Sequence, residues 1–155
     1  MLSRIVAVSA AGGHATTMIE IGRDQVPPCV GCLTCITQHP GFCISDDAIR
    51  PLAEEAAQCA FVVFLCASSF GNPSSAMKNV IDRGRLVVRN SHSRQIVIGY
   101  GETASDEEAR TFIDIVERHR GAAEIVHPKL RETIEAHFTR GVEDNVRIAA
   151  LLALV

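Results

Sequence analysis

The sequence has no tryptophan, one tyrosine and no excess of basic residues. Its 15 Lys and Arg residues are outnumbered by 18 Asp and Glu residues, which gives a formal net charge of −3. Nucleic-acid-binding proteins carry a basic face, and those that bind single strands also stack bases on aromatic side chains. The composition therefore argues against a nucleic-acid partner.

Long apolar runs are also missing. No segment reaches the ~20 apolar residues that span a bilayer. The apolar run near the start covers only residues 5–8, whereas a secretory signal needs roughly 7 to 15. We therefore expect a cytoplasmic protein with no membrane partner, in which cysteine thiols stay reduced.

Short apolar runs and amphipathic segments do alternate along the chain. The pattern predicts strands at 4–9, 18–21, 60–67, 95–100 and 124–127. It predicts helices at 47–58, 74–85, 105–121 and 129–140, the first capped by Asp46 or Asp47 and the third by Ser105 with Glu108. Such alternation is typical of one α/β domain, here residues 1–155, with a five-stranded parallel sheet. Ligands of such folds gather at the carboxyl ends of the strands, here the loops 9–17, 67–75 and 100–105.

Four of the six cysteines lie in one loop, residues 29–43, with the spacing C-x2-C-x2-C-x7-C: Cys29, Cys32, Cys35 and Cys43. Compact C-x2-C-x2-C runs are typical of cubane iron–sulfur ligation. Structural zinc more often uses two C-x2-C pairs with a longer spacer. The spacing favours a cluster, while zinc and free surface thiols stay open as alternatives. The other two cysteines, Cys59 and Cys66, adjoin or lie in an apolar strand and are expected to be core residues.

Two stretches of the chain resemble the NADPH-dependent FMN reductase family, and within it the iron–sulfur flavoproteins. One is PCVGCLTC…C…DD at 28–47, and the other is FGNPSSAMKNVIDR at 70–83. The resemblance implies a flavodoxin-like three-layer sandwich, FMN at the strand ends, and a [4Fe–4S] cubane on the four loop cysteines. It also implies FMN contacts from three segments: Ser9, Thr16 and Thr17 to the phosphate; Ser68, Ser69, Phe70, Gly71 and Asn72 to the ring and ribityl chain; Gly101 and Glu102 on the other side.

Two departures from the family pattern affect FMN. Only nineteen residues lie between Ser9 and Cys29, so the family's first helix is expected to be missing. The FMN phosphate then lacks a helix N-terminus, whose free N–H groups and dipole favour anions. The family's Pro-x-Tyr after the third strand is replaced by Ala67-Ser68-Ser69. We therefore expect weak flavin binding.

The sequence thus predicts an iron–sulfur flavoprotein-like redox protein that passes electrons between FMN and a [4Fe–4S] cluster. Its expected partners are NAD(P)H or small redox carriers. The alternatives are an NAD(P)H-dependent FMN or quinone reductase without a cluster, and a degenerate member that lacks FMN and has a structural or subunit role. We name no catalytic side chain, because the cofactors carry the redox chemistry.

The sequence ends in the apolar segment 147–155, in which large aliphatic residues recur at helical intervals. A helix there would bury its apolar face against the sheet or a second subunit, because large exposed apolar patches are rare on monomers. We expect a homo-oligomer.

Overall fold

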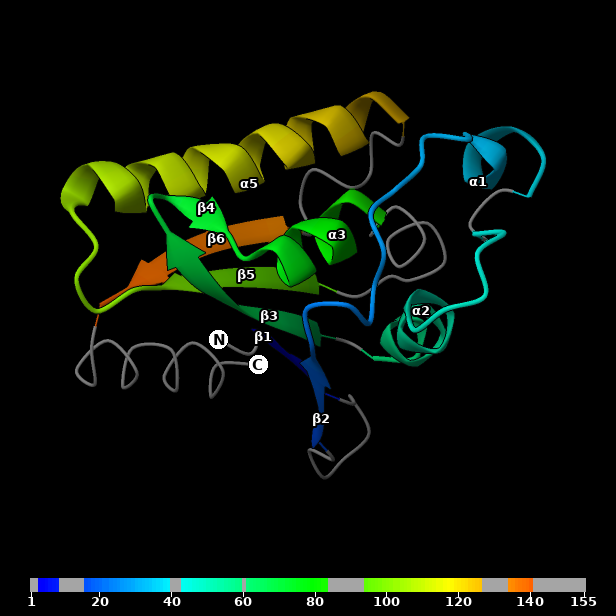
Figure 1. The fold of residues 1–155 in the computed structure, drawn as a ribbon, viewed down its shortest axis with the longest axis horizontal. Coiled ribbons are helices and arrows are strands. Elements are labelled where there is room, and N and C mark those ends of the chain that lie inside the picture. Colours follow the sequence, from blue (N-terminus) through cyan, green and yellow to red (C-terminus); the bar gives the residue numbers. More distant parts are fainter. Residues whose placement is uncertain are drawn as a thin grey trace.

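The computed structural model describes residues 3–8, 16–39, 43–59, 61–83, 94–126 and 134–140. Six strands form one sheet (Figure 1): β1 (Ser3–Val8), β2 (Thr16–Ile21), β3 (Phe61–Ser69), β4 (Asn72–Pro73), β5 (Arg94–Tyr100) and β6 (Ile134–Thr139). The main order is β2-β1-β3-β5-β6, and β4 folds back onto the end of β3. The α/β class and this order agree with the flavodoxin-like fold expected from the sequence.

The direction of β1 differs from the expectation. Strands β3, β5 and β6 pair in parallel, but β1 is antiparallel to both of its neighbours, β2 and β3. Four strands of the main path therefore run one way and β1 runs the other, so a five-stranded parallel sheet was wrong. Only seven residues, 9–15, separate β1 from β2, whereas a parallel crossover takes a dozen or more. The spacing leaves room for a hairpin but not for the family's first helix.

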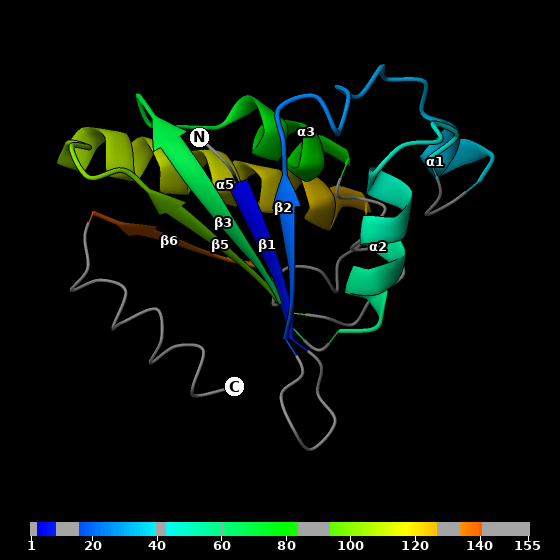
Figure 2. The same ribbon diagram turned by 60° about the horizontal axis from the view of Figure 1, so that its bottom comes forward.

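Four helices belong to the described part of the chain: α1 (Thr34–Thr37), α2 (Ile49–Ala57), α3 (Ser75–Arg83) and α5 (Asp106–Val126). Figures 1 and 2 show α3 and α5 on the same side of the sheet. The main core lies between this side and the helices, with Val62, Phe64 and Cys66 of β3 facing residues such as Ile49, Met77, Val80 and Phe112. None of the described helices is long and apolar enough to cross a membrane.

Strand β3 is buried on both faces, as its continuous apolar run predicted. Its side chains alternate between the two sides of the sheet, and Val63 joins Ile96 and Ile98 of β5 in a second buried cluster. Cys66 is fully buried and Cys59 packs partly against the main core. The core positions expected for these two cysteines are thereby confirmed.

The sequence reading fails after α5 begins. The helix runs past Gly121 to Val126, so both the helix end at Gly121 and the strand at 124–127 were wrong. A glycine inside a helix costs about 1 kcal/mol, which a long helix packed on the sheet offsets. The outer parallel strand is β6, which lies within the segment 129–140 that was expected to be a helix. Pairing of β6 with the edge of β5 overrides local helix propensity. Residues 147–155 lie outside the described part of the chain.

Candidate cysteine and flavin sites

The cysteine loop, residues 29–43, is anchored on one side and open on the other. Cys29 and Cys32 are exposed, whereas Cys35 and Cys43 are half-buried and pack against the main core. Residues 40–42 of the loop lie outside the described residues. The described thiols therefore divide into an outer pair and an inner pair.

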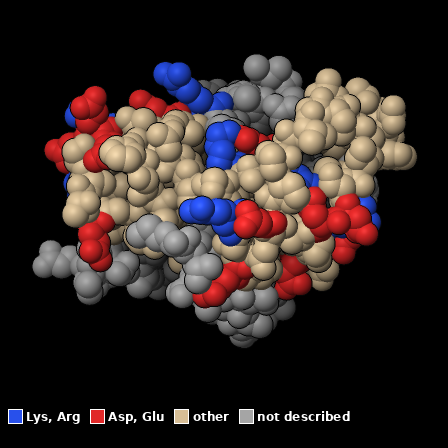
Figure 3. Space-filling view, viewed as in Figure 1, with Lys and Arg blue, Asp and Glu red and all other residues tan. Residues whose placement is uncertain are grey.

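No Asp, Glu, Lys or Arg occurs between residues 25 and 45. Figure 3 shows the corresponding surface, over α1, without charged side chains. Apolar side chains are exposed instead: Val30 at 80%, Leu33 at 56% and Ile44 at 56%. Any charge that stabilises a thiolate must therefore come from backbone dipoles or from elements behind the loop.

The backbone supplies part of this stabilisation around Cys32. Gly31 and Leu33 both adopt left-handed conformations, with φ of 69° and 57°. A left-handed leucine is sterically unfavourable, yet it shapes the turn in which Thr34 hydrogen-bonds to the Cys32 sulfur. Hydrogen bonds from the Thr34 hydroxyl and backbone lower the pKa of the Cys32 thiol.

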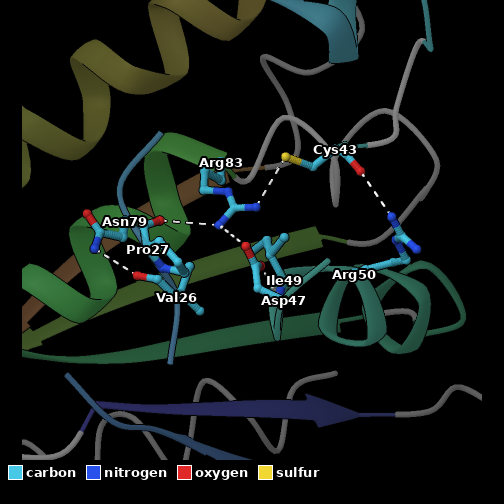
Figure 4. Close-up of polar contacts among 8 residues, drawn as sticks. All are labelled: Val26, Pro27, Cys43, Asp47, Ile49, Arg50, Asn79 and Arg83. Atoms are coloured by element: carbon cyan, nitrogen blue, oxygen red, sulfur yellow. Dashed lines mark hydrogen bonds and ion pairs between the residues drawn. The ribbon is translucent and has the colours of Figure 1, made fainter. Parts of the chain in front are cut away.

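Arg83, the last residue of α3, supplies the charge behind the loop. Its side chain is 3% exposed and donates hydrogen bonds to three partners, drawn in Figure 4. These are Asp47 Oδ2 at 2.9 Å, the Pro27 carbonyl oxygen at 3.2 Å and Cys43 Sγ at 3.1 Å. The other carboxylate oxygen of Asp47 accepts from the Ile49 N–H at 3.0 Å. One buried arginine thus ties α3 to the end of the cysteine loop and the start of α2.

Further contacts fix the same junction. Asn79 of α3 donates to the Val26 carbonyl oxygen at 2.8 Å, so α3 also holds the segment that leads into the loop. Arg50 donates to the Cys43 carbonyl oxygen at 3.4 Å and pairs with the exposed Asp46 at 3.6 Å. Sequence reasoning missed Arg83. The signals available in the sequence were the adjacent carboxylates Asp46 and Asp47 and the Asp82-Arg83 pair that ends the stretch 70–83.

The pKa values of the two inner thiols shift in opposite directions. Burial acts to raise the pKa of Cys43, but hydrogen bonds from Ser45 and Arg83 outweigh it and lower that pKa. The pKa of Cys35 is raised by burial and by the negative charges of the other loop cysteines, Cys43, Cys29 and Cys32. The four sulfurs therefore lie close enough to influence one another electrostatically.

Within the described residues, no three His, Cys, Asp or Glu side chains are grouped to hold one metal ion. A structural zinc site places four ligands around a single tetrahedral ion. The described residues show no such grouping, and Arg83 brings a cationic N–H donor to one of the four loop thiols, Cys43.

A second candidate site lies at the carboxyl end of β3. Ser68 and Ser69 end the strand, and Phe70 and Gly71 form the two-residue turn into β4. Both turn residues have positive φ, 52° and 73°, which is the hairpin turn that matches strand twist. A Cβ on Gly71 would lie 2.8 Å from Thr111 Cβ, so the turn is pressed against α5. Phe70 is 84% exposed.

The structure brings the loop after β5 to the same place. A Cβ on Gly101 would lie 3.5 Å from the Ser68 carbonyl oxygen, and the Gly101 N–H donates to the Thr139 carbonyl oxygen at 3.2 Å. Glu102 follows on an exposed turn. Of the buried side-chain oxygens described here, Ser68 Oγ and Thr139 Oγ1 have no hydrogen-bond partner. Such atoms are rare, and these two lie close to the carboxyl ends of β3 and β6. Thr139 was missed because its segment was expected to be a helix.

Of the three residues expected at the FMN phosphate, two are described and lie elsewhere. Ser9 is outside the described residues, and Thr16 and Thr17 open β2. Thr16 pairs with Val8, which in turn pairs with Phe61 at the start of β3. Ser68 lies seven positions after Phe61 in β3, roughly 23 Å along an extended strand. The described residues thus bring the carboxyl ends of β3, β5 and β6 together but do not bring Thr16 and Thr17 to them.

Comparisons with known proteins identify the family of the chain. Residues 1–108 match the model of the NADPH-dependent FMN reductase family. A 74-residue segment is 30% identical to an iron–sulfur flavoprotein of Archaeoglobus fulgidus, over 48% of this chain and 35% of that protein. The match thus spans about a third of the length of that curated relative, and no solved structure matches the chain significantly. Because the family model covers 108 of the 155 residues, the chain belongs to the NADPH-dependent FMN reductase family.

Proposed function

We propose that this chain is an iron–sulfur flavoprotein that passes electrons between FMN and a [4Fe–4S] cluster held by Cys29, Cys32, Cys35 and Cys43. The observation that carries the proposal is the hydrogen bond from Arg83 to Cys43 Sγ at 3.1 Å, made in a loop that holds four coupled thiols. FMN exchanges electrons in ones or twos and the cluster in ones, so together they would link NAD(P)H to small one-electron carriers.

Helix α3 connects the two candidate sites. It starts at Ser75, directly after the turn at 70–71 and the short strand β4, and ends at Arg83. Figure 1 shows it running from β4 towards the segment that leads to α1. Nine residues of α-helix span roughly 13 Å. A short, rigid helix would therefore hold the flavin ring and the thiols at a fixed separation.

The chain's own residues would position the flavin ring and not react with it. Ser68 Oγ and Thr139 Oγ1 are buried polar atoms with unmet hydrogen-bonding capacity. Phe70 offers an exposed aromatic ring near the place of the missing Pro-x-Tyr tyrosine. Gly101, whose Cβ position would lie 3.5 Å from the Ser68 carbonyl oxygen, brings the loop after β5 next to the end of β3.

One observation supports the reductase without a cluster as a second candidate: among the described residues, no three potential ligands are grouped around one ion. The two candidates differ in iron content. Protein purified without oxygen should contain about four iron and four sulfide per chain. Stoichiometric zinc, or flavin without iron, would reject the cluster.

A pair of cysteine variants locates the ligands. Cys32→Ala should lose iron and sulfide, because it removes one of the loop thiols. Cys59→Ala is the control, because Cys59 lies outside the loop, where it is half-buried and donates to the Glu55 carbonyl oxygen at 3.3 Å. Equal iron content in both variants would show that the loop does not hold the metal.

A further inference from the structure

Arg83 is oriented before any ligand arrives. A guanidinium presents its N–H donors in a rigid fork, and here Asp47 and the Pro27 carbonyl oxygen accept two of the bonds. With these in place, Nη2 is directed at Cys43 Sγ, 3.1 Å away. Burial of the side chain to 3% exposure keeps water from competing for that donor.

Arg50 provides a comparison within the same neighbourhood. It also contacts Cys43, but through the carbonyl oxygen, at 3.4 Å, and not through the sulfur. Its side chain is 43% exposed, so solvent screens its charge. Two arginines therefore lie against one cysteine, one bonded to sulfur from the interior and one to the backbone from the surface.

We propose that Arg83 is a positioning residue that raises the reduction potential of the cluster through its hydrogen bond to the Cys43 sulfur. This inference rests on the proposed function. Reduction adds one electron, supplied by the reduced flavin, and makes the cluster and its thiolate ligands more negative. An N–H donor on a buried cation stabilises that added charge more than it stabilises the oxidised form, and hydrogen bonds to the sulfurs are known determinants of such potentials.

The test needs variants that fold. Removing Arg83 alone would leave Asp47 unpaired in the interior, which is strongly destabilising, whereas replacing both members of a buried pair is often tolerated. The main variant is therefore the double substitution Arg83→Gln with Asp47→Asn. An asparagine at 47 can still accept from the Ile49 N–H. Asp47→Asn alone leaves Arg83 bonded to the Pro27 carbonyl oxygen and to Cys43 Sγ, so the arginine keeps acceptors. Arg50→Gln removes an equal charge that is not bonded to sulfur.

The measurement is a redox titration of the anaerobically prepared proteins, followed by electron paramagnetic resonance, with iron and sulfide content determined in parallel. The double variant should have a lower midpoint potential than the wild type. Asp47→Asn should have a higher one, because a negative charge is lost while the donor stays. Arg50→Gln should shift less than the double variant.

Different results reject different claims. A wild type without iron and sulfide rejects the proposed function, and this inference with it. If the wild type holds a cluster, two results reject only the role of Arg83. One is an unchanged potential in the double variant, and the other is a shift of the same size in Arg50→Gln. If the double variant holds no cluster, Asp47→Asn decides, and an unchanged or lower potential in that variant would overturn the inference.

Discussion

Asp46 and Asp47 are adjacent in sequence, but their surroundings differ greatly. Asp46 is 93% exposed and lies 3.6 Å from Arg50, whereas the Asp47 side chain is 14% exposed and lies 2.9 Å from the buried Arg83. Exposed ion pairs contribute at most about 1 kcal/mol, while loss of one partner of a buried pair costs about 3 to 5 kcal/mol.

Asp47→Asn should therefore lower the free energy of unfolding by about 3 kcal/mol, and Asp46→Asn by no more than about 0.5 kcal/mol. Urea unfolding of the metal-free proteins measures both. The neighbouring position is the control for the loss of one carboxylate from this segment. Similar destabilisation by the two variants would show that the buried pair does not hold the junction together.

The cysteines should differ in reactivity towards alkylating agents. The pKa is lowered for Cys32 and Cys43, raised for Cys35, and raised by burial to about 11 for Cys66. Because the thiolate is the nucleophile, a lowered pKa leaves more reactive thiolate at a given pH. In metal-free protein, Cys32 and Cys43 should react faster than Cys35 at each pH between 7 and 9, and Cys66 should stay unmodified. Mass spectrometry of a timed iodoacetamide reaction tests this order, and early labelling of Cys35 would contradict it.

Among the elements, the turn between β3 and β4 is tightly constrained by packing. A Cβ on Gly71 would lie 2.8 Å from Thr111 Cβ and 2.9 Å from the Glu108 carbonyl oxygen, at a φ of +73°. Gly31 has a similar φ of +69°, but a Cβ there meets nothing within 4 Å. The two glycines therefore separate the backbone cost of alanine from its packing cost.

Gly31→Ala should destabilise the protein by about 1 to 2 kcal/mol, the cost of a left-handed non-glycine residue. Gly71→Ala should have the same backbone cost and a further packing cost of about 1 to 3 kcal/mol, because the methyl group collides with α5. Thermal unfolding monitored by circular dichroism compares the two variants. Equal shifts in melting temperature would mean that the turn does not pack against α5 as described.

Local signals in the sequence predicted the beginnings of helices and failed where distant contacts decide. Ser105 and Glu108 form the expected reciprocal cap of α5, with hydrogen bonds of 2.7 and 3.2 Å, because both partners lie within one turn. For α2 the N-cap residue is Ala48, whereas Asp46 or Asp47 was expected. Asp47 Oδ1 accepts from the Ile49 N–H, while its other oxygen bonds to the buried Arg83. No local signal could show that α5 continues past Gly121. None could show that 134–139 becomes a strand, because pairing with the edge of β5 determines that strand.

For the whole molecule, the strand order was predictable from the family resemblance. The direction of β1 was also predictable, from the short connection at 9–15, but this inference was not made. This reversal separates Thr16 and Thr17 from the flavin loops. Arg83 and Thr139 became visible as candidate site residues only in three dimensions. Their roles depend on which elements meet, at Cys43 for one and at Gly101 for the other.

The placement of Thr16 and Thr17 leads to a prediction about flavin selectivity. If the described residues hold the ring but not the phosphate, FMN and riboflavin should bind with similar dissociation constants, and FMN should be lost on gel filtration. Flavin fluorescence titration measures both affinities. A preference for FMN of about tenfold, or ~1.4 kcal/mol, would reveal a phosphate site that this arrangement lacks.

The most direct test of the account is the number of electrons that one chain accepts. Anaerobic protein with both cofactors bound should take up about three electrons on reductive titration, two into the flavin and one into the cluster. Cys32→Ala with flavin bound should take up about two. Wild-type protein that accepts only the two electrons of a flavin, with no signal from a reduced cluster, would contradict an electron-transfer role for the cysteine loop.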